Sequence, residues 1–331
     1  MKLKYDIIKS LAFGVDYTEI QEDRVVFSRF SKQERNVLNY GKDNSFATAG
    51  VRLEFETDSR HLKIKVCVKG SNPHGRNFYS FDVYSNDSLI GQIKNFNKEP
   101  QYPYKKYSLA DRQKTFTLSG GLKRIRIYFP WSVQGMIKEI EIDDGSSIMP
   151  VTHKRKIVMY GDSITQGYDS EKPSRSYASR LTDWLDADGI NKGIGGSVFL
   201  PELAGIKASF IPDFITVSYG TNDWNGAVFD SFKKRCTAFY ENLTHNYQDT
   251  PILAIAPIWR ADSGERRVFG DFSKVADTLK DIAAQYKNIS FIDGIDFIPK
   301  NTEYYRDSYL HPNDRGFDKY ADALCLNIDT I

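Results

Sequence analysis

Four short segments of the chain carry side chains that could cooperate in nucleophilic catalysis. They are Gly-Asp-Ser at 161–163, Asn-Lys-Gly-Ile-Gly-Gly at 191–196, Gly-Thr-Asn-Asp at 220–223, and the run at 307–314 that contains His311. A serine hydroxyl attacks a carbonyl carbon only when a base takes its proton, and histidine is the most common base. The serine and the histidine therefore predict an acyl-transfer site that cleaves esters.

Such a site also needs hydrogen-bond donors for the oxyanion that develops on the carbonyl oxygen. The backbone N–H of Ser163, the backbone N–H of Gly196 and the side-chain amide of Asn222 could supply three donors. His311 is the expected base because it alone among the histidines follows the last predicted strand of the C-terminal half. We expect Asp162 to brace the turn that presents the serine rather than to touch the substrate.

The predicted secondary structure differs between the two halves of the chain. Residues 1–147 alternate apolar and polar side chains, as in Val51, Leu53 and Phe55, and turns rich in Gly, Asn and Pro separate the runs. A period of two is typical of strands with one buried face, and many short strands of this kind predict a β-sandwich. The polar run at 143–147 is the expected linker to the second domain.

Residues 155–331 alternate strands with helices. Nearly all-apolar strands are expected at 157–160, 214–219, 252–256 and 289–292, with helical stripes between them. This alternation predicts an α/β domain in which a parallel sheet has helices on both faces. Active sites in such sheets form at the carboxyl ends of the strands. We therefore expect the four chemistry-bearing segments to converge on one edge of the sheet.

The same segments resemble the conserved blocks of the SGNH (GDSL-type) hydrolase superfamily. Gly-Asp-Ser-Ile-Thr at 161–165, the glycines at 193–196, Gly-Thr-Asn-Asp at 220–223 and His-Pro-Asn at 311–313 match those blocks in order. The resemblance covers roughly residues 155–331 and implies a flavodoxin-like three-layer α/β/α domain. It also implies that the serine is the nucleophile, the histidine the base, and Gly196 and Asn222 oxyanion donors.

One position departs from the pattern of this superfamily. The aspartate of the triad usually precedes the histidine by three residues, and this chain has Ser308 at that position. Asp307 lies four residues before His311, and residues three and four apart share a face of a helical turn, so Asp307 could still reach the imidazole. The alternative is a Ser–His dyad in which a backbone carbonyl orients the histidine.

Composition and charge exclude several other functions. The 331 residues carry a net charge of +2 with scattered Lys and Arg, so neither a nucleic acid nor a membrane surface is an expected partner. There is no cluster of His, Cys and Asp with metal-ligand spacing and no phosphate-loop ending after the glycines. We therefore expect no metal and no cofactor. Cys67, Cys236 and Cys325 are expected to be reduced and buried.

The N-terminus has no apolar core of the kind found in signal peptides, and no run of the sequence approaches 18 apolar residues. From this we expect a cytoplasmic enzyme. The sequence gives no indication of the oligomeric state.

The order of the two domains bears on the substrate. A β-sandwich before an SGNH domain is similar to the architecture of two-domain carbohydrate esterases, in which the N-terminal jelly roll resembles a carbohydrate-binding module. We therefore expect a serine esterase that removes short acyl groups, O-acetyl above all, from a small-molecule or oligosaccharide ester. Trp131 could lie near the cleft or pack at the domain interface. The alternatives are a GDSL-type lipase or acylhydrolase acting on lipid or thioester substrates, and a glycan-binding protein with an inactive hydrolase domain.

Overall fold

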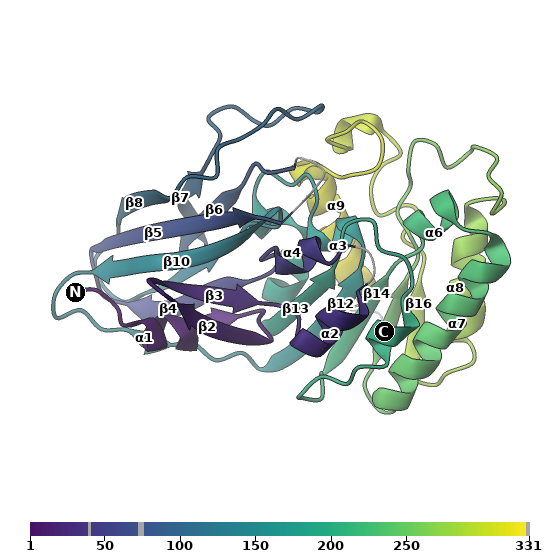
Figure 1. Ribbon diagram of the computed structural model, residues 1–331, viewed down its shortest axis with the longest axis horizontal. Coiled ribbons are helices and arrows are strands. Elements are labelled where there is room, and N and C mark those ends of the chain that lie inside the picture. Colours follow the sequence, from purple (N-terminus) through teal and green to yellow (C-terminus); the bar gives the residue numbers. More distant parts are fainter. Residues whose placement is uncertain (39–40, 72–75, 329–331) are drawn as a thin grey trace. The chain divides into compact units, whose positions relative to one another are not determined.

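The computed structural model describes residues 1–38, 41–71 and 76–328, and the course of the chain can be followed in Figure 1. The chain divides into two compact units. The first unit comprises Met1–Ser31, Asp43–Lys154 and Glu171–Ser174. The second unit comprises Lys32–Lys42, Arg155–Ser170 and Arg175–Ile331. Each unit therefore includes a short segment from the part of the sequence that mainly forms the other.

Two antiparallel sheets make up the first unit. One sheet has the order β2 (Tyr17–Gln21), β3 (Arg24–Ser28), β10 (Val133–Ile142), β5 (His61–Gly70) and β8 (Arg112–Thr117). The other has the order β1 (Ala12–Phe13), β4 (Arg52–Thr57), β9 (Lys123–Tyr128), β6 (Ser80–Ser85) and β7 (Ser88–Lys94), with β11 (Met149–Pro150) beside β4. The alternation of apolar and polar residues that predicted these strands places one face of each sheet against the other.

The two sheets share one apolar core. Phe27 of β3 and Phe81 of β6 both pack on Phe129, with ring centroids 4.9 Å and 5.0 Å away. The predicted all-β N-terminal domain is therefore confirmed. Trp131 is 3% exposed and meets Phe78 edge to face, so its ring is buried and offers no open face for a sugar.

A parallel sheet forms the centre of the second unit. Its order is β13 (Ala187–Gly193), β12 (Arg155–Gly161), β14 (Phe214–Ser218), β15 (Ile252–Ile255) and β16 (Ile289–Ile292). Both faces of β12 are buried, which explains why its sequence is a continuous apolar run. The parallel order places the carboxyl ends of all five strands at one edge, as the sequence predicted.

Helices cover both faces of this sheet (Figure 1). Ile157 and Met159 of β12 pack in one cluster with α4 (Tyr177–Trp184) and α9 (Asp314–Ile328). Tyr160 points to the other face and packs on Phe239 of α7 (Phe229–Asn246). The predicted three-layer α/β/α domain is therefore confirmed. The short helices α3 (Ser163–Gln166) and α6 (Thr221–Gly226) follow the carboxyl ends of β12 and β14. The helix α5 (Pro201–Ala204) packs on α7, α8 (Ser273–Ala283) packs on β15 and β16, and the 3-10 turn η3 (Thr302–Tyr304) precedes α9.

The remaining helices are short: α1 (Tyr5–Ser10), α2 (Lys32–Val37), and the 3-10 turns η1 (Asp43–Phe46) and η2 (Pro173–Arg175). The helix α2 belongs to the second unit, where Glu34 forms a buried ion pair of 2.6 Å with Lys192 of β13. Cys67 and Cys236 are buried as expected, whereas Cys325 is half-buried. Within the described ranges, no helix has the length and apolar character needed to span a bilayer.

Candidate active site

Ser163 is the first residue of α3, directly after β12. Asp162 caps this helix, because its Oδ1 accepts the backbone N–H of Ile164 at 2.9 Å. Asp162 is 3% exposed, and burial raises its pKa to about 7 against the opposing effect of that hydrogen bond. The carboxyl group thus holds the turn that presents the serine, and the expectation that it does not touch the substrate stays a prediction.

The glycines at the end of β13 and just after it allow the chain to pass close to α3. A Cβ atom on Gly193 would lie 2.4 Å from the backbone nitrogen of Gln166, so only glycine fits there. The side chain of Asn191 donates to the carbonyl of Thr165 at 2.6 Å, and Gly195 N–H donates to the side chain of Gln166 at 2.8 Å. These bonds fix the glycine segment against the helix that carries the serine.

The structure brings the predicted nucleophile and base together. His311 Nε2 lies 2.9 Å from Ser163 Oγ, and His311 Nδ1 lies 2.7 Å from Asp307 Oδ2. The serine is 2% exposed and the imidazole 13%, so both are shielded from solvent. With the proton on Nδ1, the imidazole donates to the carboxylate and can accept the hydroxyl proton through Nε2. This is the geometry of a Ser–His–Asp triad.

The loop that carries Asp307 and His311 explains how an acid four residues before the base, instead of the usual three, can still reach it. Asp307 Oδ1 accepts the backbone N–H groups of Tyr309, Leu310 and His311 at 3.0, 2.8 and 3.1 Å. Ser308 adopts the left-handed conformation, with φ of 57°, which turns the chain sharply enough for these contacts. The carboxylate therefore reaches the imidazole across four residues by means of a tight turn and not along a helix.

Electrostatics favours the ionised form of this acid. Burial by itself opposes ionisation, but the hydrogen bond and the charge of His311 and the backbone donors outweigh it and lower the pKa of Asp307 to about 2. A carboxylate that is ionised at all physiological pH values can stabilise the imidazolium that forms when the serine loses its proton.

The sequence analysis did not single out a second carboxylate near the base. Asp169 is fully buried, and its Oδ2 lies 3.9 Å from His311 Nδ1. The residue has φ of 70°, and no regular pattern in the sequence marks it. Ligand atoms of Asp169, Asp307 and His311 lie within 4.8 Å of one another, close enough to share a metal ion. The expectation that the site uses no metal stays a prediction.

The three predicted oxyanion donors lie at the ends of neighbouring strands. Ser163 N–H begins α3, and Gly196 follows β13 in the left-handed conformation with φ of 81°. Asn222 is the second residue of α6, which follows β14, and its amide donates to the carbonyl of Ser197 at 3.0 Å. That bond holds the amide against the glycine segment and leaves its second N–H available. Whether these groups bind an oxyanion stays a prediction.

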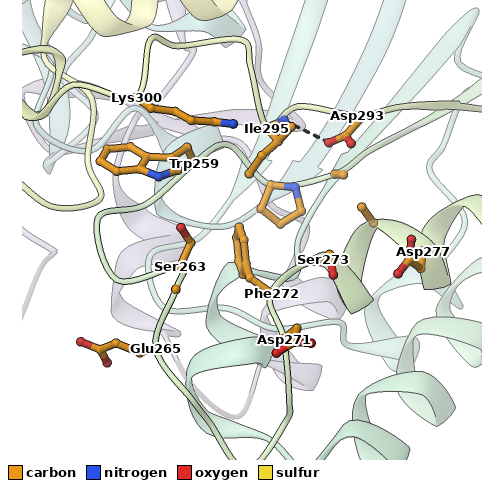
Figure 2. Close-up of a pocket in the computed structure, with 14 residues that line it drawn as sticks. Trp259, Ser263, Glu265, Asp271, Phe272, Ser273, Asp277, Asp293, Ile295 and Lys300 are labelled. Atoms are coloured by element: carbon orange, nitrogen blue, oxygen red, sulfur yellow. Dashed lines mark hydrogen bonds between the residues drawn. The ribbon is translucent and has the colours of Figure 1, made fainter.

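A cavity of about 540 Å³ lies farther along the same edge, at the ends of β15 and β16. Figure 2 shows the Trp259 indole and Lys300 on one side of it, with Asp293, Ser273 and Asp277 on the other. Trp259 also contacts the loop of residues 305–311, which carries Asp307 and His311 and is called the catalytic loop below, because the Tyr305 hydroxyl donates to the backbone carbonyl of Trp259 at 3.0 Å. The volume is in the range of small-molecule sites. Neither the cavity nor its lining was predicted from the sequence.

The fold and this geometry define a serine hydrolase with a three-layer α/β/α domain. Residues 159–319 match the GDSL-like lipase/acylhydrolase family. This match identifies a GDSL-like hydrolase domain in the C-terminal part of the chain, in agreement with the SGNH resemblance, and it supports a carboxylic ester hydrolase. A search of curated protein sequences finds no match.

Solved structures share the whole two-part architecture. A salicylyl-acyltransferase from a tetracycline biosynthetic pathway is 19% identical, with a TM-score of 0.82 over 96% of this chain and 94% of its own. A protein from Bacteroides ovatus described as a GDSL-like lipase is 20% identical, with a TM-score of 0.78 over 100% and 97%. A family two carbohydrate esterase from Clostridium thermocellum, solved with cellohexaose, is 15% identical, with a TM-score of 0.63 over 86% and 93%. At these identities the likeness concerns the fold.

Proposed function

We propose that this protein is a serine esterase that removes short acyl groups, O-acetyl above all, from carbohydrate esters. The observation that carries the proposal is the chain of contacts from Ser163 Oγ through His311 to Asp307, at 2.9 Å and 2.7 Å. An arrangement of nucleophile, base and buried carboxylate at these distances is what acyl transfer through a covalent intermediate requires.

In the proposed mechanism, Ser163 Oγ attacks the ester carbonyl while His311 Nε2 takes the hydroxyl proton. The negative charge on the carbonyl oxygen is stabilised by the N–H groups of Ser163 and Gly196 and by the amide of Asn222. The imidazolium then gives its proton to the departing alcohol, which leaves an acyl-serine. A water molecule, deprotonated by the same imidazole, attacks the acyl-serine, and collapse of the second tetrahedral intermediate releases the acid and restores the serine.

Two observations support a sugar as the alcohol part of the substrate. The cavity beside the catalytic loop combines the half-buried indole of Trp259 with hydroxyl and carboxylate groups, such as those of Ser263, Asp271 and Asp293. An indole offers an apolar face together with a polar N–H, and carboxylates accept hydrogen bonds from hydroxyl groups. The family two carbohydrate esterase with the same two-part fold was solved with a cello-oligosaccharide, which agrees with this class of substrate.

An ester panel tests the proposal. The substrates are acetylated xylo-oligosaccharides, p-nitrophenyl acetate and p-nitrophenyl esters of longer acyl chains, with Ser163→Ala as the inactive control. We expect the acetylated sugars to have the highest kcat/KM and the long-chain esters the lowest. Faster turnover of long-chain esters or lysophospholipids would assign the protein to the lipase alternative. Failure of the wild type to hydrolyse any short ester would favour the glycan-binding alternative.

Trp259→Ala tests the alcohol site separately from the chemistry. We expect it to raise KM for acetylated sugars about tenfold and to leave the hydrolysis of p-nitrophenyl acetate unchanged, since about 1–1.5 kcal/mol of aromatic contact is lost. Trp184→Ala is the matched control, because Trp184 is 43% exposed and lies at the edge of the sheet opposite the cavity. Its neighbour Leu185 accepts a hydrogen bond through its backbone carbonyl from Arg155, the first residue of β12. An equal effect of both substitutions on the sugar ester would show that the cavity does not bind the sugar.

The acyl-enzyme could also pass its acyl group to an alcohol other than water. One of the structural neighbours is an acyltransferase, so the same assay should also measure acyl transfer to an alcohol. Adding an acceptor sugar to the reaction with p-nitrophenyl acetate and separating the products distinguishes the two outcomes. We expect free acetate as the main product, and acetylated sugar as the main product would make the protein an acyltransferase.

A further inference from the structure

Arg260 is a buried arginine on the loop that follows β15, and it is 2% exposed. Its guanidinium lies between two rings, 5.1 Å from the centroid of Trp224 and 5.2 Å from that of Tyr309. Nε donates to Asp262 Oδ1 at 2.5 Å and Nη2 to Asp262 Oδ2 at 3.1 Å, a two-pronged ion pair. The guanidinium is therefore held rigidly, because the carboxylate pairs with its charge and the two aromatic rings pack against it.

One arm of this guanidinium reaches the helix that carries the predicted oxyanion donor. Nη1 donates to the carbonyl oxygen of Thr221 and to its hydroxyl, both at 3.0 Å. Thr221 is the first residue of α6, and Asn222 is the second. The arginine thus fixes the backbone immediately before the amide that also bonds to the carbonyl of Ser197.

The other arm reaches the loop that carries the base. Nη2 of Arg260 donates to the hydroxyl of Tyr309 at 2.6 Å, and that hydroxyl in turn donates to Asp262. The backbone N–H of Tyr309 donates to Asp307 Oδ1 at 3.0 Å, inside the turn that brings Asp307 to His311. The tyrosine therefore links the guanidinium to the acid of the triad.

The ion pairs around Arg260 do not involve the catalytic residues. Asp262 is buried and accepts from Arg260, Tyr309 and Arg267. Burial opposes its ionisation, but these donors outweigh the effect and lower the pKa of Asp262. Among the described residues, the guanidinium forms no hydrogen bond or ion pair with Ser163 or His311, so its direct bonds reach the site only through the elements that it ties together.

We propose that Arg260 is a positioning residue that holds Asn222 and the His311 loop in register with each other. The inference rests on the proposed function, since it assigns the two tethered elements their roles in acyl transfer. Arginine suits this task because its planar fork donates in several fixed directions at once, which a lysine cannot do. A displacement of about 1 Å in a catalytic group can lower the rate about 10²-fold.

Arg260→Met tests the proposal, with Arg267→Met as the matched control. Arg267 binds the same carboxylate and lies 4.6 Å from the centroid of the Trp224 ring, but in the part of the chain that the structure describes it forms no hydrogen bond with Thr221 or Tyr309. For p-nitrophenyl acetate we expect Arg260→Met to lower kcat about 10- to 100-fold with KM changed less than about threefold. We expect the control to change kcat less than about threefold. Equal losses in the two variants would overturn the proposal.

A mutant cycle with three substitutions separates positioning from a general loss of structure. If Arg260 acts through the two tethered elements, its substitution should lower kcat by less than about threefold when Asn222→Ala and Tyr309→Phe are already present. A full multiplicative loss in that background would show that the arginine acts elsewhere. Should Arg260→Met fail to fold, Tyr309→Phe alone carries the test, since this side chain is 36% exposed and loses only its hydroxyl. We expect a three- to tenfold loss of kcat, and an unchanged kcat would refute the tether.

The failure of this inference can be told apart from the failure of the proposed function. Ser163→Ala without any loss of esterase activity would refute the function itself. An inactive Ser163→Ala protein together with equal effects of Arg260→Met and Arg267→Met would refute only the positioning role.

Discussion

Replacing Asp307 by Asn tests whether the site is a triad or a Ser–His dyad. The substitution preserves the side-chain oxygen that accepts the backbone N–H groups of residues 309–311, but it puts a neutral amide 2.7 Å from His311 Nδ1. Without a carboxylate, the imidazole loses the partner that selects the productive tautomer and stabilises the imidazolium. We expect kcat for p-nitrophenyl acetate to fall about 10³- to 10⁴-fold, the scale reported for a triad acid in the serine proteases.

The structure also gives a magnitude for stability. The pKa of Asp307 is lowered from 3.8 to about 2, which at about 1.4 kcal/mol per pKa unit corresponds to about 2 kcal/mol of stabilisation. A lowered pKa means that this stabilisation is present above the unfolded value of 3.8 and is lost as the pH falls through about 2. Urea unfolding at pH 7 should therefore show a loss of about 2 kcal/mol in Asp307→Asn, and a smaller loss at pH 3.

The assay compares steady-state kinetics of the wild type, Asp307→Asn and Asp169→Asn at pH 7. Asp169 is the matched control, since it is a buried carboxylate 3.9 Å from the same nitrogen, beyond hydrogen-bond distance. We expect the control to lose less than about tenfold in kcat. A loss of less than about tenfold in Asp307→Asn would contradict the triad and leave a dyad, or a role for Asp169, as the better description.

Three further predictions follow from the site and its supports. Asn222→Ala should lower kcat about 10²- to 10³-fold with little change in KM, and unchanged steady-state kinetics would remove this amide from the oxyanion site. The raised pKa of Asp162, about 7, gives the wild type a stability contribution that is fully present below pH 3.8 and is lost as the pH rises through 7, ~4 kcal/mol in all. Asp162→Asn should therefore abolish this pH dependence of the free energy of unfolding. Urea unfolding of both proteins at pH 4 and pH 8 measures this, and a constant difference between them would refute it. Glu34→Gln should lower the free energy of unfolding by about 3 kcal/mol, since it removes one charge of a buried pair of 2.6 Å with Lys192, and a loss below about 0.5 kcal/mol in urea would contradict the pairing.

Much of the fold could be predicted from local patterns. The alternation in Val51, Leu53 and Phe55 correctly predicted a strand whose apolar side chains enter the core, because side chains in a strand point alternately to its two faces. It did not predict that Arg52 and Glu54 on the other face are buried as well, where they form an ion pair. The continuous apolar run of β12 likewise reports a strand buried on both faces. The rule that ligands bind at the carboxyl ends of parallel strands then placed Ser163 and His311 at one edge.

The parts that could not be predicted depend on contacts between distant residues. Glu34 and Lys192 are 158 positions apart, and nothing in the short run around α2 marks it as part of the second unit. The approach of Asp169 to His311 depends on a left-handed residue in an irregular loop, which has no periodicity to read. The contact between Asp307 and His311 was predicted from the spacing of residues in a helical turn. In the structure it depends instead on the left-handed conformation of Ser308.

The most direct test of the central claim is to trap the acyl-enzyme. The protein is mixed with p-nitrophenyl acetate, quenched with acid and digested, and the acetylated peptide is identified by mass spectrometry, with Ser163→Ala in parallel. We predict acetyl on Ser163 in the wild type, and a fall in turnover of at least about 10³-fold in the variant. Acetyl on another residue, or a variant that retains more than about a tenth of the wild-type kcat, would contradict the assignment of Ser163 as the nucleophile.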